Sequence, residues 1–273
     1  MKKFIGFAFI LAGCSPNQLP DYDLLKGLRV LAMPVDLPEV APGAQVNITP
    51  VVSDIPGAGR TLSWKASGCV DPGVGIGAIP SCELAADQAS LGSGTVALSA
   101  PSFTQALSSI AVTIPASILD HRLASDQYNG VAYLVTFDIS AADGSKVSSF
   151  KRVIASNKAT KNANPSITDV LSGGSSMAAL PQTATPLSLQ LNANSIETYT
   201  AMTSDQTQVT RVESLTTTWF MSDGSFSRYR SQNGDANTFT PPDTLPTAHA
   251  VVLVMVLRDD RGGEDFKIKS YFH

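Results

Sequence analysis

The stretch at residues 250–257 is Ala250-Val251-Val252-Leu253-Val254-Met255-Val256-Leu257, which is apolar at every position. A short continuous run of aliphatic residues bounded by polar sequence is typical of a strand that is buried on both faces. A strand of a β-sandwich buries one face in its own core, so the other face needs a cover. Loops or the insertion at residues 196–213 are the simpler cover. Contact with another domain or with a partner is the alternative.

The same order of elements occurs twice in the chain. The apolar strand is followed by the turn Arg261-Gly262-Gly263 and a return strand at 266–272, just as a strand at 131–139 is followed by Asp143-Gly144 and a return strand at 146–155. Each half also carries one tryptophan on a middle strand, Trp64 in the first half and Trp219 in the second, and we expect Trp64 to anchor its core. This common order predicts two copies of one domain.

Composition agrees with strands. The chain has 273 residues, 43% of them hydrophobic and only 15% charged, which is enough for two domains of ordinary size. Short apolar segments separated by proline and glycine are typical of an all-β protein. We therefore expect domains at residues 28–157 and 165–273, joined by a polar, basic linker at 158–164.

The first residues resemble an export signal. Lys2 and Lys3 precede a short apolar run that ends in Leu11-Ala12-Gly13-Cys14, a pattern that follows secretory signals and is too short to span a membrane. This run resembles the lipobox of bacterial lipoproteins. The resemblance implies that residues 1–13 are removed, that Cys14 carries lipid such as palmitate, and that the protein is anchored to a membrane. The alternative is an ordinary signal peptide in which Cys14 is incidental.

The residues after Cys14 bear on location. In the lipoprotein family an aspartate after the cysteine favours the inner membrane, and this chain has Ser15 there. The resemblance therefore favours a place in the bacterial cell envelope at the outer membrane. Residues 14–27 are expected to be the lipidated N-terminus and a polar tether.

The strand order, the tryptophan on a middle strand and the closing hairpin of each half resemble the immunoglobulin-like sandwiches of exported bacterial proteins, including PKD-like and cadherin-like modules. The resemblance covers residues 28–272 and implies two tandem β-sandwich domains. Two features depart from it. A PKD module has an aspartate- and glycine-rich turn after its tryptophan strand, which Asp223-Gly224 matches only in part. The antibody-type cysteine pair across the two sheets is absent.

The cysteine count predicts one disulfide. With Cys14 lipidated, Cys69 and Cys82 remain as an even pair in an oxidising compartment. A crosslink that closes a loop of about 15 residues contributes on the order of 3 kcal/mol in the chain-entropy treatment. The alternative is two free buried thiols. Zinc is disfavoured, because two cysteines without a nearby histidine leave a zinc site half built.

The acidic net charge argues against nucleic acid as a partner, and one group of carboxylates raises the question of calcium binding. The net charge is −4, and removal of residues 1–13 with their two lysines makes it −6, which argues against nucleic acid as a partner. Calcium needs six to eight oxygens, and carboxylates flank the last turn at Asp259, Asp260, Glu264 and Asp265. The simpler interpretation is a solvated hairpin turn, so we expect no metal and no cofactor.

Catalytic patterns are not recognisable. The chain has no Gly-x-Ser-x-Gly elbow, and the glycine-rich run at 73–77 is followed by Pro80 where a nucleotide-binding helix would begin. The histidines, His121, His249 and His273, suggest no constellation. We therefore expect a membrane-anchored envelope lipoprotein, not an enzyme, that displays its domains for binding or structural support, with an envelope protein or polysaccharide as partner. The alternative is an envelope enzyme or carbohydrate-processing protein with an unrecognised site.

Overall fold

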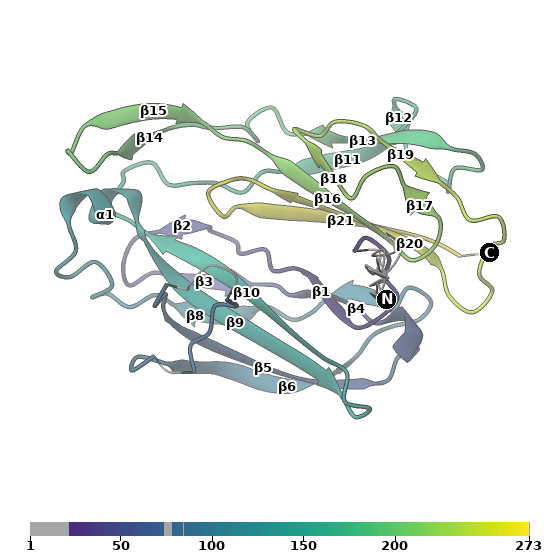
Figure 1. Ribbon diagram of the computed structural model, residues 1–273, viewed down its shortest axis with the longest axis horizontal. Helices are drawn as coiled ribbons and strands as arrows, with labels where there is room; N and C mark the ends of the chain where they lie inside the picture. Colours follow the sequence, from purple (N-terminus) through teal and green to yellow (C-terminus); the bar gives the residue numbers. More distant parts are fainter. Residues whose placement is uncertain (1–21, 74–77, 84, 273) are drawn as a thin grey trace, which may run out of the picture.

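The computed structural model describes residues 22–73, 78–83 and 85–272, and Figure 1 shows layered β-sheets. The predicted all-β sandwich-type fold is confirmed. Within these residues the helical elements are a 3-10 turn at Ile55–Gly57 and one helix, α1 (Ala124–Asn129). Each sheet is built from strands of one half of the chain. We call residues 28–157 the first half and residues 165–272 the second half.

In its described residues the first half contains ten strands in three hydrogen-bonded groups. A five-stranded sheet has the order β2-β10-β9-β5-β6, and its buried face packs with two smaller sheets, β1-β4-β7 and β3-β8, into one hydrophobic cluster. The strands are β1 (Arg29–Ala32), β2 (Glu39–Val40), β3 (Gln45–Ile48), β4 (Val51–Ser53), β5 (Thr61–Val70), β6 (Ala89–Ala97), β7 (Thr104–Ala106), β8 (Ile110–Thr113), β9 (Val131–Ala141) and β10 (Lys146–Ala155).

The second half is a two-layer sandwich with a projecting hairpin. A five-stranded sheet, β12-β11-β13-β19-β17, packs on a four-stranded sheet, β18-β16-β20-β21, while β14 and β15 pair only with each other. The strands are β11 (Ile167–Ser172), β12 (Ser175–Ser176), β13 (Thr185–Leu191), β14 (Thr198–Met202), β15 (Gln208–Val212), β16 (Thr216–Met221), β17 (Ser225–Phe226), β18 (Arg230–Gln232), β19 (Asn237–Thr240), β20 (Val251–Arg258) and β21 (Glu264–Tyr271).

Strand β20 belongs to both hydrophobic cores. Its odd-numbered residues from Val251 to Leu257 pack in the core of the second half, whereas Val252, Val254 and Val256 join the cluster that forms the core of the first half. Successive side chains of a strand point to opposite faces, so an unbroken apolar run suits a strand between two cores. Figure 1 shows β16, β20 and β21 between the first half and the layer of β11 and β13.

The outer face of β20 is not covered by loops or by the insertion at 196–213, contrary to our simpler interpretation. The insertion at 196–213 forms the hairpin of β14 and β15, which extends toward α1 (Figure 1). There the hydroxyl groups of Tyr128 and Thr200 lie 2.5 Å apart. The first half covers β20 instead, which is the alternative of contact between domains.

Two local predictions change. Trp64 is only half-buried and stacks on Phe137 at 5.7 Å, while its neighbours Leu62 and Ala66 are buried, so Trp64 flanks the core and does not anchor it. Trp219, by contrast, is fully buried. The sequence also favours a helical turn at 83–90 and a short helix at 116–126. The described residues of the first stretch form turns and the start of β6, and in the second stretch the helix begins only at Ala124.

The predicted disulfide between Cys69 and Cys82 is present, and it ties the end of β5 to the following loop. The predicted tether is shorter than expected at its C-terminal end. Leu24 forms a parallel bridge with Met221, the Leu25 amide donates to the Met221 carbonyl at 2.7 Å, and Leu25 is buried. The chain thus contacts the second half before it enters the first.

The shared strand predicts coupled unfolding. Val254→Ala removes two buried carbons at the seam and should lower the free energy of unfolding by about 2 kcal/mol. Urea unfolding is followed by tryptophan fluorescence in two backgrounds: Trp219→Phe, where Trp64 reports on the first half, and Trp64→Phe, where Trp219 reports on the second. We expect Val254→Ala to lower the free energy of unfolding by the same amount in both. Val212→Ala, at a side chain that is 65% exposed, is the matched control and should change neither signal. A decrease seen by only one tryptophan would contradict the shared core.

Candidate binding cleft between the two halves

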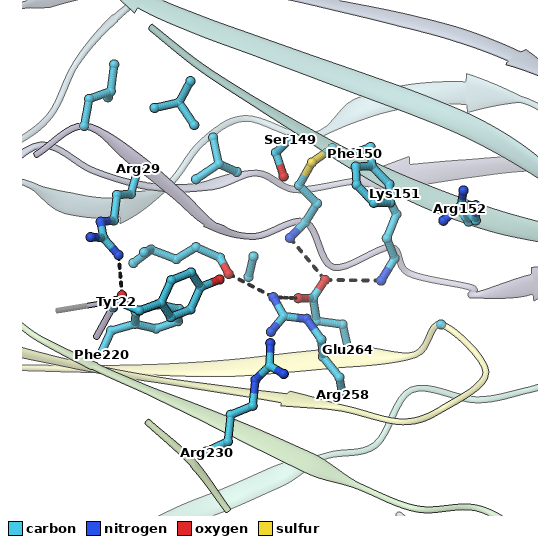
Figure 2. Close-up of a pocket in the computed structure, with 17 residues that line it drawn as sticks. Tyr22, Arg29, Ser149, Phe150, Lys151, Arg152, Phe220, Arg230, Arg258 and Glu264 are labelled. Atoms are coloured by element: carbon cyan, nitrogen blue, oxygen red, sulfur yellow. Dashed lines mark hydrogen bonds and ion pairs between the residues drawn. The ribbon is translucent and has the colours of Figure 1, made fainter. Parts of the chain in front are cut away.

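The seam between the halves opens into a cleft of about 710 Å³. One wall comes from the first half, through β1 and β10, and the other comes from the second half, through β16, β18, β20 and β21. Figure 2 shows the polar and aromatic side chains of this cleft, which converge from both walls. The labelled residues are Tyr22, Arg29, Ser149, Phe150, Lys151, Arg152, Phe220, Arg230, Arg258 and Glu264.

The cleft is basic although the protein is acidic. Among the described residues that line it, five are basic and one carries a carboxylate, Glu264. The basic residues are Arg29, Lys151, Arg152, Arg230 and Arg258. Arg152 is neutralised from outside, because its Nε lies 2.5 Å from Asp71 Oδ2. In a chain with a net charge of −4, such a local excess of positive charge attracts anions.

Glu264 lies at the centre of the cleft and is buried, with 3% of its side chain exposed. The Lys151 ammonium and the Met33 amide donate to Oε2 at 3.2 and 3.1 Å. Arg258 Nη2 lies 2.7 Å from Oε1 and donates to the Leu31 carbonyl at 2.9 Å (Figure 2). Burial alone would raise the pKa of Glu264, but Lys151, Arg258 and the hydrogen bonds lower that pKa below its ordinary value.

The mouth of the cleft is aromatic and cationic. Tyr22 lines the cleft, and Tyr229 lies beside it, with ring centroids 6.0 Å apart in an edge-on arrangement. The two side chains are 57% and 50% exposed. The Arg29 guanidinium lies over the Tyr22 ring at 5.8 Å, and that of Arg230 lies over Tyr229 at 5.3 Å. Arg29 also donates to the Tyr22 carbonyl (Figure 2). Each guanidinium is therefore held near an aromatic ring at the surface.

A second charged network crosses the seam, but its charges are paired internally. Arg261, in the turn between β20 and β21, contacts Glu39 at 2.8 Å, Glu213 at 3.0 Å and Glu197 at 3.2 Å, and it lies 4.3 Å from the Tyr199 ring centroid. Burial raises the pKa of Glu213. This network joins β2, the β14–β15 hairpin and the last turn, and we assign it a structural role.

Lys158, from the linker, lies beside this network. Its ammonium is 3.9 Å from Glu39 and within 6 Å of the ring centroids of Tyr128 and Tyr199. Burial lowers the pKa of Lys158 more than the neighbouring Glu39 raises it. The linker is therefore packed into the seam.

The calcium candidates do not form an oxygen cage. Asp259 accepts hydrogen bonds from the Arg261 and Gly263 amides at 2.8 and 2.7 Å, and Asp265 accepts one from the Ile167 amide at 2.7 Å. Asp260 is exposed, and Glu264 is the buried carboxylate of the cleft. Within the described residues no group of three or more histidine, cysteine, aspartate or glutamate side chains is placed to hold a metal.

The other residues singled out from the sequence lie apart. His249 Nδ1 is 3.7 Å from Asp223, and His121 is exposed. His273, Cys14 with its Leu-Ala-Gly run, and residues 74–77 of the glycine-rich run lie outside the described residues. In the part of the chain that the structure describes, no helix is both long and apolar enough to cross a membrane.

Sequence reasoning missed the cleft. Its basic residues come from four strands, β1, β10, β18 and β20, and Arg29 and Arg258 are 229 positions apart. Apart from the adjacent pair Lys151 and Arg152 on β10, each is a single cation in a β-rich segment, so no long run of lysine or arginine marks the site. The one available signal was the second apolar face of residues 250–257, which indicated a seam but not its charge.

Acid should weaken the Glu264 network. Because the pKa of Glu264 is lower in the folded chain than its ordinary value of 4.5, the stabilisation is complete above that value and is lost as the pH falls through the folded pKa. We expect the free energy of unfolding to fall with acid less steeply in Glu264→Gln than in the wild type. Because one group titrates, the slopes of the free energy of unfolding against pH in the two proteins can differ by at most about 1.4 kcal/mol per pH unit. Parallel pH curves would contradict this assignment.

Loss of Arg261 should be costly. Arg261→Met leaves the buried Glu39 and Glu213 carboxylates without their main cation, which costs about 3–5 kcal/mol in such pairs. Urea unfolding measures the loss, and Arg122→Met at an exposed site is the control. Adding Glu213→Gln to Arg261→Met should recover part of the loss. A loss no larger than that of the control would show that the network is not stabilising.

Comparisons with known proteins give no family. No protein-family model and no curated protein matches the chain. Among solved structures, dimeric latent PorU from Porphyromonas gingivalis aligns with 91% of this chain at 8% identity and a TM-score of 0.23, and this chain spans 24% of that one. Spo0M, a sporulation control protein from Bacillus subtilis, aligns over 89% of each chain at 10% identity and a TM-score of 0.24. Similarities this weak support no inference about function.

Proposed function

We propose that this protein is a lipid-anchored protein of the bacterial envelope whose two immunoglobulin-like halves form one binding scaffold. The observation that carries the binding role is the basic cleft between the halves, where the described lining residues include four cations besides the Asp71-paired Arg152 and one buried carboxylate. Ligand sites commonly lie at domain interfaces and combine apolar walls with a few polar groups. An envelope protein or an envelope polysaccharide is the class of partner.

The packing of the halves supports this role. The cleft walls belong to different halves, and β20 places its two faces in their two cores. Glu264 adds ionic contacts from the second half to Lys151 of the first. Walls that are already held in position lose little conformational entropy when a ligand binds, so ordering them reduces the binding free energy only slightly.

The lipid anchor rests on the sequence alone. Leu11-Ala12-Gly13-Cys14 resembles the lipobox, and two or more acyl chains hold a protein on a bilayer stably. Ser15 after the cysteine favours the outer membrane. The disulfide of Cys69 and Cys82 supports export, because such bonds persist in oxidising compartments.

Metabolic labelling tests the anchor. Bacterial cells that express the full chain are grown with a clickable palmitate, and the protein is recovered and assayed for label. We expect label on the wild type and on Ser15→Ala, and none on Cys14→Ala, because only the Cys14 thiol begins the modification. An unlabelled wild type, or a labelled Cys14→Ala protein, would refute the anchor.

A further inference from the structure

We propose that the mouth of the cleft binds the phosphate of an anionic lipid headgroup, through Arg29 and Arg230. This inference rests on the proposed anchoring and extends it, because it assigns the anchored protein a second, headgroup-specific contact with the membrane. The chemistry is that of a phosphate with an apolar neighbour, held between guanidinium groups and aromatic rings.

The two arginines are available for an anion. Arg29 and Arg230 come from opposite walls of the cleft, and within the described residues no carboxylate lies within 4.0 Å of either guanidinium. A guanidinium presents its donors as a planar fork that matches two phosphate oxygens. In Figure 2 the Arg230 side chain points toward Arg258 in the interior of the cleft.

The Glu264 carboxylate does not cancel the positive charge of the cleft. Glu264 is paired with both Lys151 and Arg258, so these three groups together keep one positive charge. The side chain of Arg258 is 40% exposed, which lets its charge act at the mouth. An entering phosphate therefore meets a positive site, and Glu264 is shielded from it by its own partners.

The aromatic residues at the mouth suit the surface of a bilayer. Tyr22 and Tyr229 are half exposed, and Tyr22 also packs against Phe220, with ring centroids 6.1 Å apart. Tyrosine is enriched at membrane–water interfaces, because its ring is apolar while its hydroxyl group stays hydrated. Exposed tyrosines beside arginines would contact the acyl boundary while the guanidinium groups reach phosphates.

Chain length puts the mouth within reach of the membrane. Tyr22 lines the cleft and follows Cys14 by eight residues, which span at most about 29 Å when fully extended. A lipid on Cys14 thus keeps the mouth near the bilayer. Because surface charges are screened over about 8 Å at physiological ionic strength, the arginines act only when this face lies against the headgroups.

Vesicle binding by a chain that cannot be lipidated tests the inference. The full chain with Cys14→Ser is mixed with vesicles of phosphatidylcholine, with and without phosphatidylglycerol, and sedimented. We expect binding to the anionic vesicles that is lost at about 1 M salt, where the screening length is about 3 Å. Arg29→Gln/Arg230→Gln should bind about fivefold more weakly for each arginine removed.

Matched controls separate this contact from charge in general. Arg122→Gln/Arg211→Gln removes the same charge at two exposed residues that do not line the cleft, and it should bind as the parent does. Thermal unfolding checks that each variant is folded. If the double cleft variant is unfolded, Arg230→Gln alone, at an exposed side chain, should still show the fivefold loss.

The vesicle experiment tests the inference, and a second experiment distinguishes a lipid phosphate from a soluble one. Equal binding by the cleft and control variants, or no preference for phosphatidylglycerol, would overturn the inference. Calorimetry with inorganic phosphate provides the other arm: saturable binding that requires Arg29 and Arg230, without vesicle binding, would assign the cleft to a soluble phosphate compound. The vesicle experiment uses the Cys14→Ser chain, so its result does not depend on lipidation. If this chain binds anionic vesicles but the wild type takes up no palmitate, the lipid anchor is refuted and the headgroup contact stands.

Discussion

The structure depends on the burial of both faces of β20. Its side chains alternate between two cores, with Val254 in the core of the first half and Met255 in that of the second. The second half alone would leave one apolar face of this strand in water, at a cost of roughly 25 cal/mol per Å². The docking of the halves therefore follows from the same hydrophobic effect that folds each of them.

The hairpin that begins with β20 also supplies the ionic contacts across the seam. Arg261 in its turn contacts Glu39 of the first half, and Glu264 at the start of β21 contacts Lys151. Buried ion pairs add little net stability over apolar packing, but breaking one is costly. The apolar strand thus supplies the energy of association, while the charges at its end favour one register of the two halves.

The cleft follows from this register. The first half packs on the sheet face formed by β16, β20 and β21. The groove beside this contact receives Arg29 from one wall and Arg230 and Arg258 from the other. Glu264 holds the deeper cations in place by pairing with Lys151 and Arg258. The two arginines at the mouth, each over a tyrosine ring, are left to act on what enters.

Alternation and turn residues are local signals, so β9, β10 and β20 could be predicted from the sequence. The even pair of cysteines left after Cys14 predicted the disulfide between Cys69 and Cys82. The sequence also showed that residues 250–257 need cover on both faces. The identity of that cover, the position of Trp64 at the margin of its core and the meeting of distant cations in one cleft became visible only in the folded chain. A periodic pattern states which face is apolar, whereas the identity of its neighbour depends on contacts between residues more than two hundred positions apart.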